Sequence, residues 1–215
     1  THESVPSNEP IRTSSRSNQD KNERKSSNEN NLLKNLSEQD RLLVEKADSG
    51  DVSSCYIVAK NCIRGVNNFP MVPEVGLTDL NKAIKSNYPK ALNLYAMLLI
   101  EGKIINKDLN LAESKLLQGV QLGNTDSMVY LGLLYQSTNM KLNESVDLFK
   151  RAARKKNLRG MFNYANSLHH GIGSLEKDEE KAAKYYKIAF TEDNVNKVNE
   201  LITYIMINAL KDYNF

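Results

Sequence analysis

The feature of this 215-residue sequence that most constrains its fold is a pattern that occurs four times. Each copy has a small residue, then a pair of residues four and five positions later, then a larger residue three positions after the pair. The copies start 37, 36 and 33 residues apart. Their starting residues are Ser54, Ala91, Ser127 and Gly160. A repeat of this length is typical of arrays of helical hairpins.

The second residue of each central pair is Ala or Gly, namely Ala59, Ala96, Gly132 and Ala165. We expect these positions to be where the two helices of a hairpin meet, because a larger side chain would hold the helices apart. Each copy is followed by a second predicted helix, at residues 78–85, 109–122, 144–155 and 179–190. No segment alternates with period two for long enough to be a strand, so the sequence predicts an all-α array of four hairpins.

The fourth copy carries the most specific motif, Tyr164-Ala165 followed by Gly171-Ile172-Gly173, Asp178 and Lys181-Ala182. At these residues the chain resembles the Sel-one-like repeat family of the tetratricopeptide superfamily. The resemblance covers about residues 51–197, although the loop within the third copy is short and lacks glycine. It implies a right-handed α-solenoid of antiparallel helix pairs that acts mostly as an adaptor between proteins.

The predicted organisation has four parts. Residues 1–30 contain twelve Ser or Asn and two aliphatic residues, so they have little to bury and we expect a disordered polar tail. A capping helix is predicted within 31–50, with Ser37 and Asp40 at its start and Gly50 at its end. The four repeats are predicted at 51–88, 89–124, 125–157 and 158–194, and a second capping helix at 195–215.

The composition argues against several classes of function. A net charge of +3 is too small for binding to a nucleic-acid backbone along the whole chain, so we expect no nucleic-acid partner. The longest apolar stretches, of about ten residues, are half of a membrane span. We therefore expect a cytoplasmic chain, although it does not begin with Met and an upstream signal or domain stays open.

Candidate chemical groups are few. Cys55 and Cys62 lie two turns apart on one predicted helix, too far for a disulfide, and we expect them to be buried thiols. His169 and His170 lack the spacing of a metal site, so we expect no metal, no cofactor and no catalytic residue. Six cations between 150 and 159 form the one patch that would attract phosphate, RNA or an acidic peptide, but a solvated edge is the commoner explanation. They are Lys150, Arg151, Arg154, Lys155, Lys156 and Arg159.

These observations predict a non-enzymatic scaffold that binds a protein or peptide segment. By the resemblance, the first helix of each pair lines a concave face, and fixed positions on it contact the partner. The resemblance selects Tyr56, Lys60, Arg64, Lys90, Asn93, Met97, Glu101, Asp126, Val129, Leu133, Gln136, Arg159, Phe162, Asn166, His169 and His170. Among them, Val129, Leu133 and Phe162 are predicted as exposed apolar anchors, and packing against the next helix is the alternative.

Two other functions stay open at this stage. The chain is compatible with the regulatory portion of a larger enzyme, such as a protein kinase whose catalytic part lies upstream. It is also compatible with an adaptor in degradation at the endoplasmic reticulum or in cell-wall synthesis, as some relatives of the family are.

Overall fold

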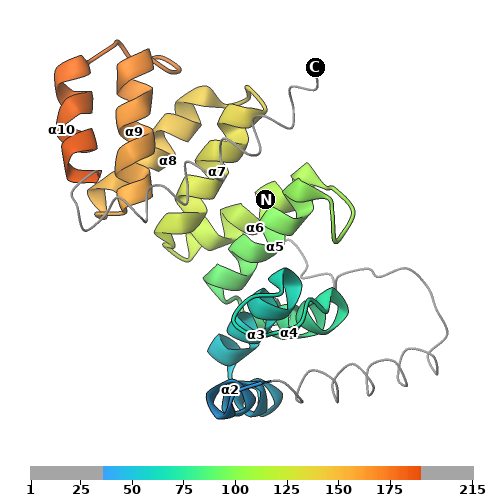
Figure 1. Ribbon diagram of the computed structural model, residues 1–215. Coiled ribbons are helices and arrows are strands. Elements are labelled where there is room, and N and C mark those ends of the chain that lie inside the picture. Colours follow the sequence, from blue (N-terminus) through green and yellow to red (C-terminus); the bar gives the residue numbers. More distant parts are fainter. Residues whose placement is uncertain (1–35, 190–215) are drawn as a thin grey trace, which may run out of the picture. The chain divides into compact units, whose positions relative to one another are not determined.

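The computed structural model describes residues 36–189, which form helices and turns with no strand in that range (Figure 1). The chain divides into two compact units, with the boundary after Lys115, inside helix α6 (Leu109–Gln121). Each unit is described by itself. The predicted tail at 1–30 and the predicted capping helix at 195–215 lie outside the described residues.

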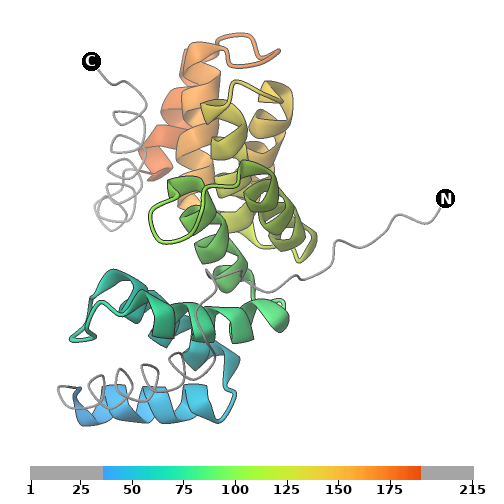
Figure 2. The ribbon, with the colours of Figure 1, turned by 90° about the vertical axis from the view of Figure 1, so that its right-hand side faces the viewer.

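The first unit contains α2, both helices of the first pair, α3 and α4, and the first helix of the second pair, α5 (Figures 1 and 2). Helix α3 packs on both α2 and α4, and α5 contacts α3 and α4. Their bounds are α2 Glu38–Asp48, α3 Val52–Arg64, α4 Pro73–Lys85 and α5 Pro89–Glu101.

The second unit contains the last two helical pairs. Helix α7 packs against α8, α8 against α9, and α9 against α10, so neighbours in sequence are neighbours in space. Their bounds are α7 Thr125–Ser137, α8 Leu142–Arg154, α9 Leu158–His170 and α10 Glu179–Ala189. We call α3, α5, α7 and α9 the first helices, and α4, α6, α8 and α10 the second helices.

Side-chain caps explain why the repeat pattern starts at a small residue. The side chain of Asp51 accepts a hydrogen bond from the backbone N–H of Ser54 at 2.7 Å. The equivalent bonds start α7, from Ser127 to Asn124 at 2.8 Å, and α9, from Gly160 to Asn157 at 2.9 Å. The starting residue is thus the third residue of each of these helices, and its backbone N–H donates to the capping side chain.

The N-terminal helix has the predicted cap. Ser37 Oγ accepts from the backbone N–H of Asp40 at 3.2 Å and donates to the Asp40 carboxylate at 2.7 Å. The helix ends at Asp48, and Gly50 follows with a left-handed φ of 94°. The helix is therefore where the sequence predicted it.

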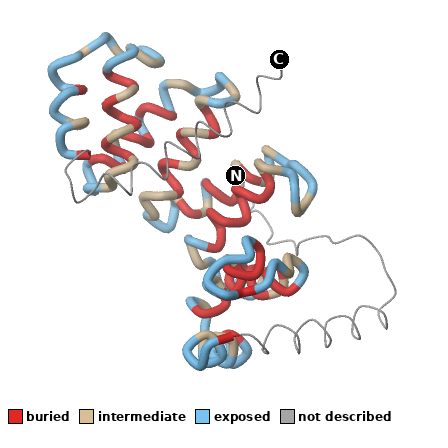
Figure 3. Tube along the Cα trace, viewed as in Figure 1, coloured by how far each residue is buried: buried red, intermediate tan, exposed pale blue. Residues whose placement is uncertain are grey.

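The Ala and Gly residues of the central pairs lie in the core, as predicted. Buried and exposed residues alternate along the helices of both units (Figure 3). Ala59, Ala96 and Ala165 are fully buried. At Gly132, a Cβ atom would lie 2.5 Å from Cε1 of Phe149 on α8, closer than two carbon atoms approach. The missing side chain therefore allows α7 and α8 to pack together.

Three of the four first helices end at a glycine. Helices α3, α5 and α9 end at Gly65, Gly102 and Gly171, each in the left-handed conformation. Helix α7 has no such glycine, and its shorter loop uses left-handed Asn139 and Lys141 instead. The third pair is therefore closed by a different turn.

The starts of two second helices differ from prediction. The helix predicted to begin at residue 78 begins at Pro73, because proline has the φ of a first helical residue and needs no hydrogen-bond acceptor there. The helix predicted to begin at residue 144 begins at Leu142. The predicted repeat boundaries stay a prediction.

Candidate partner-binding surface

In the first unit, the predicted partner-binding residues lie on the two first helices, α3 and α5. Tyr56, Lys60 and Arg64 recur every four residues, so they lie along one side of α3. Lys90, Met97 and Glu101 have helical spacing on α5. These two rows form what we call the first-helix face of the first unit.

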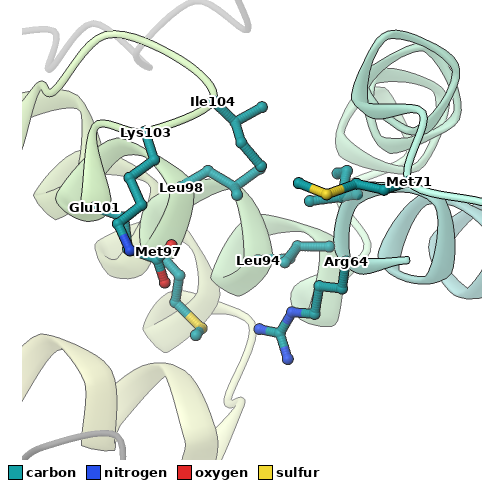
Figure 4. A pocket seen from close by; sticks show the side chains of 9 residues that line it. Arg64, Met71, Leu94, Met97, Leu98, Glu101, Lys103 and Ile104 are labelled. Carbon is teal, nitrogen blue, oxygen red and sulfur yellow. The ribbon is translucent and has the colours of Figure 1, made fainter. Parts of the chain in front are cut away.

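A pocket with a cavity volume of about 330 Å³ lies where these two helices end (Figure 4). Arg64 comes from α3, and Met97 and Glu101 come from α5, so three residues of the predicted set contribute to it. The complete lining is Ile63, Arg64, Met71, Leu94, Met97, Leu98, Glu101, Lys103 and Ile104. Six of these nine side chains are apolar, which makes the pocket suitable for an apolar group.

The sequence analysis missed the residues that the loops contribute to the pocket. Met71 precedes α4, and Lys103 and Ile104 follow α5. Met71 is 64% exposed, the highest value among the exposed large apolar residues of the described range. That exposure was not visible in the sequence, because it depends on how the loop after Gly65 turns back.

Charged groups surround the apolar lining. Arg64 and Lys103 provide two cations and Glu101 one carboxylate, and none of the three forms a salt bridge with another residue in the 36–189 range. Farther along the same helices, Lys60 is half-buried and Lys90 is exposed. The first-helix face of the first unit is therefore predominantly positive.

An aromatic pair marks the other end of this face. The rings of Tyr56 and Tyr88 lie 5.6 Å apart at an interplanar angle of 58°. Tyr56 is one turn before Lys60 on α3, and Tyr88 comes two residues before Lys90. The face thus has an apolar pocket near the C-terminal ends of α3 and α5, and tyrosines near their N-terminal ends.

In the second unit, the predicted residues contact one another or their neighbours. The ring of Phe162 lies 5.6 Å from that of Tyr186, whose hydroxyl donates to the Asn166 side chain at 3.5 Å. The guanidinium of Arg159 donates to the Tyr130 hydroxyl at 3.1 Å. Asp126 accepts a hydrogen bond from Asn157 at 2.8 Å. These contacts organise the first-helix face of the second unit.

Some predicted contact residues are buried. Val129 is 1% exposed, so the prediction that it is an exposed anchor is wrong, and packing, the alternative, is correct for it. Asn93 and Met97 are also buried, although Met97 reaches the pocket. Leu133 and Phe162 are half-buried. That these residues form one partner-binding face stays a prediction, and position along a helix did not predict how deeply each residue lies.

The ends of α7 and α9 carry three more members of the predicted set. The side-chain nitrogen of Gln136 is buried and has no hydrogen-bond partner among the described residues. His169 and His170 are exposed, and their rings make an edge-to-face contact at 4.7 Å. Residues 36–189 contain no group of three His, Cys, Asp or Glu side chains placed to hold a metal ion.

The two cysteines are buried free thiols, as predicted. Desolvation by burial, followed by the charge of Asp79, raises the pKa of Cys62 to about 12. Burial also raises the pKa of Cys55, whose thiol donates to the Ala47 carbonyl at 3.3 Å. Neither side chain forms a reactive thiolate near neutral pH.

The cluster of cations at the end of α8 is partly engaged within the second unit. Arg151 lies 3.7 Å from the Asp147 carboxylate, and Lys155 donates to the Gly123 carbonyl at 3.5 Å. Arg159 contacts Tyr130, as above. These contacts favour the interpretation of the cluster as a helix end with stabilising cations.

Comparison with known structures agrees with this architecture. A Sel1 repeat protein from Oxalobacter formigenes matches 73% of this chain with a TM-score of 0.64 and 19% identity. The chain has the Sel1-like repeat fold. A protective antigen of uropathogenic Escherichia coli, c5321, which displays the same fold, matches 77% of the chain with a TM-score of 0.62 and 21% identity.

These matches confirm the predicted all-α fold class and its resemblance to Sel-one-like repeats at the level of the fold. The chain spans 63% and 36% of the lengths of these two proteins. No family model and no curated protein matches the sequence. Within residues 36–189, no helix is long and apolar enough to cross a membrane.

Proposed function

We propose that the chain is a non-enzymatic scaffold that binds a segment of a partner protein on the face formed by its first helices. The observation that carries this proposal is the pocket of about 330 Å³ between the ends of α3 and α5. Its apolar wall consists of the core residues Ile63, Leu94 and Leu98, and the exposed Met71 lies at its edge, so an apolar group that entered would bury apolar surface. Each hairpin of such an array packs mainly on its neighbours, which leaves one side of the first helices available to a ligand.

Site-specific photo-cross-linking tests which face binds a partner. A benzophenone amino acid replaces Tyr56 on α3 or Phe162 on α9, two aromatic positions of the first helices, and the full chain is expressed in its native cells. Control chains carry the same group at Lys85 on α4 or Lys187 on α10, which are exposed on second helices. We expect adducts with another protein from Tyr56 or Phe162 and none from the controls. Adducts of equal yield from both sets would refute the proposal.

A further inference from the structure

The pocket between α3 and α5 has properties that restrict what enters it. Its volume of about 330 Å³ is at the lower end of the range for ligand sites, roughly 300–1,000 Å³, so it has room for one or two side chains. Its floor includes Ile63, Leu94 and Leu98, which are almost completely buried. No polar group is available on these three side chains, so the entering group must be apolar.

Two methionines determine how selective the pocket is. Met71 and Met97 lie on different sides of it, one from the loop before α4 and one from α5 (Figure 4). Methionine is unbranched and polarizable, and it adapts its shape to different apolar partners. We therefore expect the pocket to accept leucine, methionine or phenylalanine rather than one of them alone.

The charges around the pocket select the residues next to the apolar group. Lys60, Arg64, Lys90 and Lys103 are cations on the first-helix face or the pocket, against the single carboxylate of Glu101. Two further carboxylates cap helix N-termini. Asp51 accepts the backbone N–H of Ser54 at the start of α3, about 20 Å along that helix from Arg64, and Asp108 accepts that of Leu111 at the start of α6. The charge of this face thus complements an acidic ligand.

The spacing between the pocket and the lysines sets the length of the ligand. Lys60 is four residues from Arg64, and Lys90 is seven from Met97, distances of roughly 6 and 10 Å along a helix. An extended peptide covers about 3.3 Å per residue. Acidic residues two to four positions from the apolar residue would reach both lysines.

We propose that the first-helix face of the first unit binds an acidic segment of a partner protein, which inserts one bulky apolar side chain between Met71 and Met97. The proposal rests on the scaffold function proposed above and adds the chemistry of the partner. The apolar anchor supplies contact area in a desolvated pocket, and the carboxylates pair with Lys60, Arg64 and Lys90 at its border.

Fluorescence anisotropy with defined peptides tests this chemistry. The probe is a labelled octapeptide with one leucine and three aspartates that start two residues from it, synthesised in both sequence orders. We expect one order to bind the full chain, with at least about a tenfold loss when alanine replaces leucine or asparagine replaces the aspartates, a change of about 1.4 kcal/mol. Raising the salt concentration should weaken binding of the aspartate peptide more than that of the asparagine peptide.

Variants of the chain locate the site. Arg64→Glu should weaken binding of the aspartate peptide by at least about tenfold. Met71→Asp should do the same, because it places a carboxylate in the pocket. The matched control is Lys85→Glu, the same charge reversal in the last turn of a helix of the same unit, on α4. It should leave affinity unchanged. Circular dichroism of each variant verifies that the helices are intact.

The outcomes separate this proposal from the scaffold function. Failure of both aspartate peptides to bind, or equal binding of the aspartate and asparagine peptides, overturns the proposal that the partner segment is acidic. Partner adducts from Tyr56 in the cross-linking experiment would then leave the scaffold function standing. Adducts of Tyr56 with a second copy of this chain would overturn the acidic partner as well. If neither peptides nor adducts are found, both proposals fail.

Discussion

Replacing Gly132 by leucine tests the contact on which the third helical pair depends. A Cβ atom at this position would lie 2.5, 2.8 and 3.1 Å from three ring atoms of Phe149. Phe149 is fully buried, so its ring cannot turn into solvent. Overpacking of this kind costs about 1–3 kcal/mol, and loss of a helical glycine returns up to about 1 kcal/mol. Because leucine adds three carbons beyond Cβ, we expect a net destabilisation of about 2 kcal/mol.

The measurement is urea unfolding followed by far-UV circular dichroism, since the chain contains no tryptophan for fluorescence. The control is Lys187→Leu on α10, an exposed position where the same residue should change stability by less than about 0.5 kcal/mol. Equal effects of the two substitutions would show that Gly132 is not a contact position.

A double substitution examines the reason for the effect. Phe149→Ala alone should cost about 3–5 kcal/mol, because it leaves a cavity in the core. In that background the leucine at position 132 occupies part of the cavity, so it should destabilise little or not at all. The expected coupling energy is about 0.5–3 kcal/mol. Strictly additive effects would refute the proposed steric conflict between positions 132 and 149.

Four further predictions concern the two thiols, a helix cap and a turn. Both buried cysteines should resist a disulfide reagent at pH 8 until urea unfolds the chain, and a rapid reaction of the native chain would contradict their burial. Burial raises the pKa of Cys62 to about 12, so its neutral thiol contributes to the free energy of unfolding below pH 9, and this contribution is lost as the pH rises towards 12. In urea titrations, Cys62→Ala should flatten this decline of stability with pH. Asn157→Ala should cost about 1–2 kcal/mol in the same assay, because the side chain caps α9 and also donates to Thr125 and Asp126; no loss would mean that water replaces these bonds. Lys156→Gly should stabilise the chain by about 1 kcal/mol, because Lys156 has a left-handed φ of 61°. Lys155→Gly, at a φ of −85°, should not stabilise it. Stabilisation by both substitutions would contradict the left-handed conformation of Lys156.

Within residues 36–189 the sequence alone predicted the presence and order of the helices and the small residues where they pack, but it placed the start of α4 five residues too late. Three of the four starting residues have a capping side chain three residues earlier, and the hydrogen bond that results is local. The small central residues were recognisable because close packing of two helices tolerates no other side chain there, as Gly132 against Phe149 illustrates. Gly65, Gly102 and Gly171 end helices because glycine adopts a left-handed φ without strain.

The tertiary structure decided which of the predicted face residues are accessible. Val129 and Leu133 are one helical turn apart, yet the first is buried and the second half-buried, because exposure depends on the elements that cover each position. The pocket likewise needed the folded loops, which bring Met71, Lys103 and Ile104 beside residues of α3 and α5. Capping hydrogen bonds and the helical repeat involve residues three or four positions apart, so they can be recognised in a sequence. Burial and cavities arise from contacts between segments far apart along the chain.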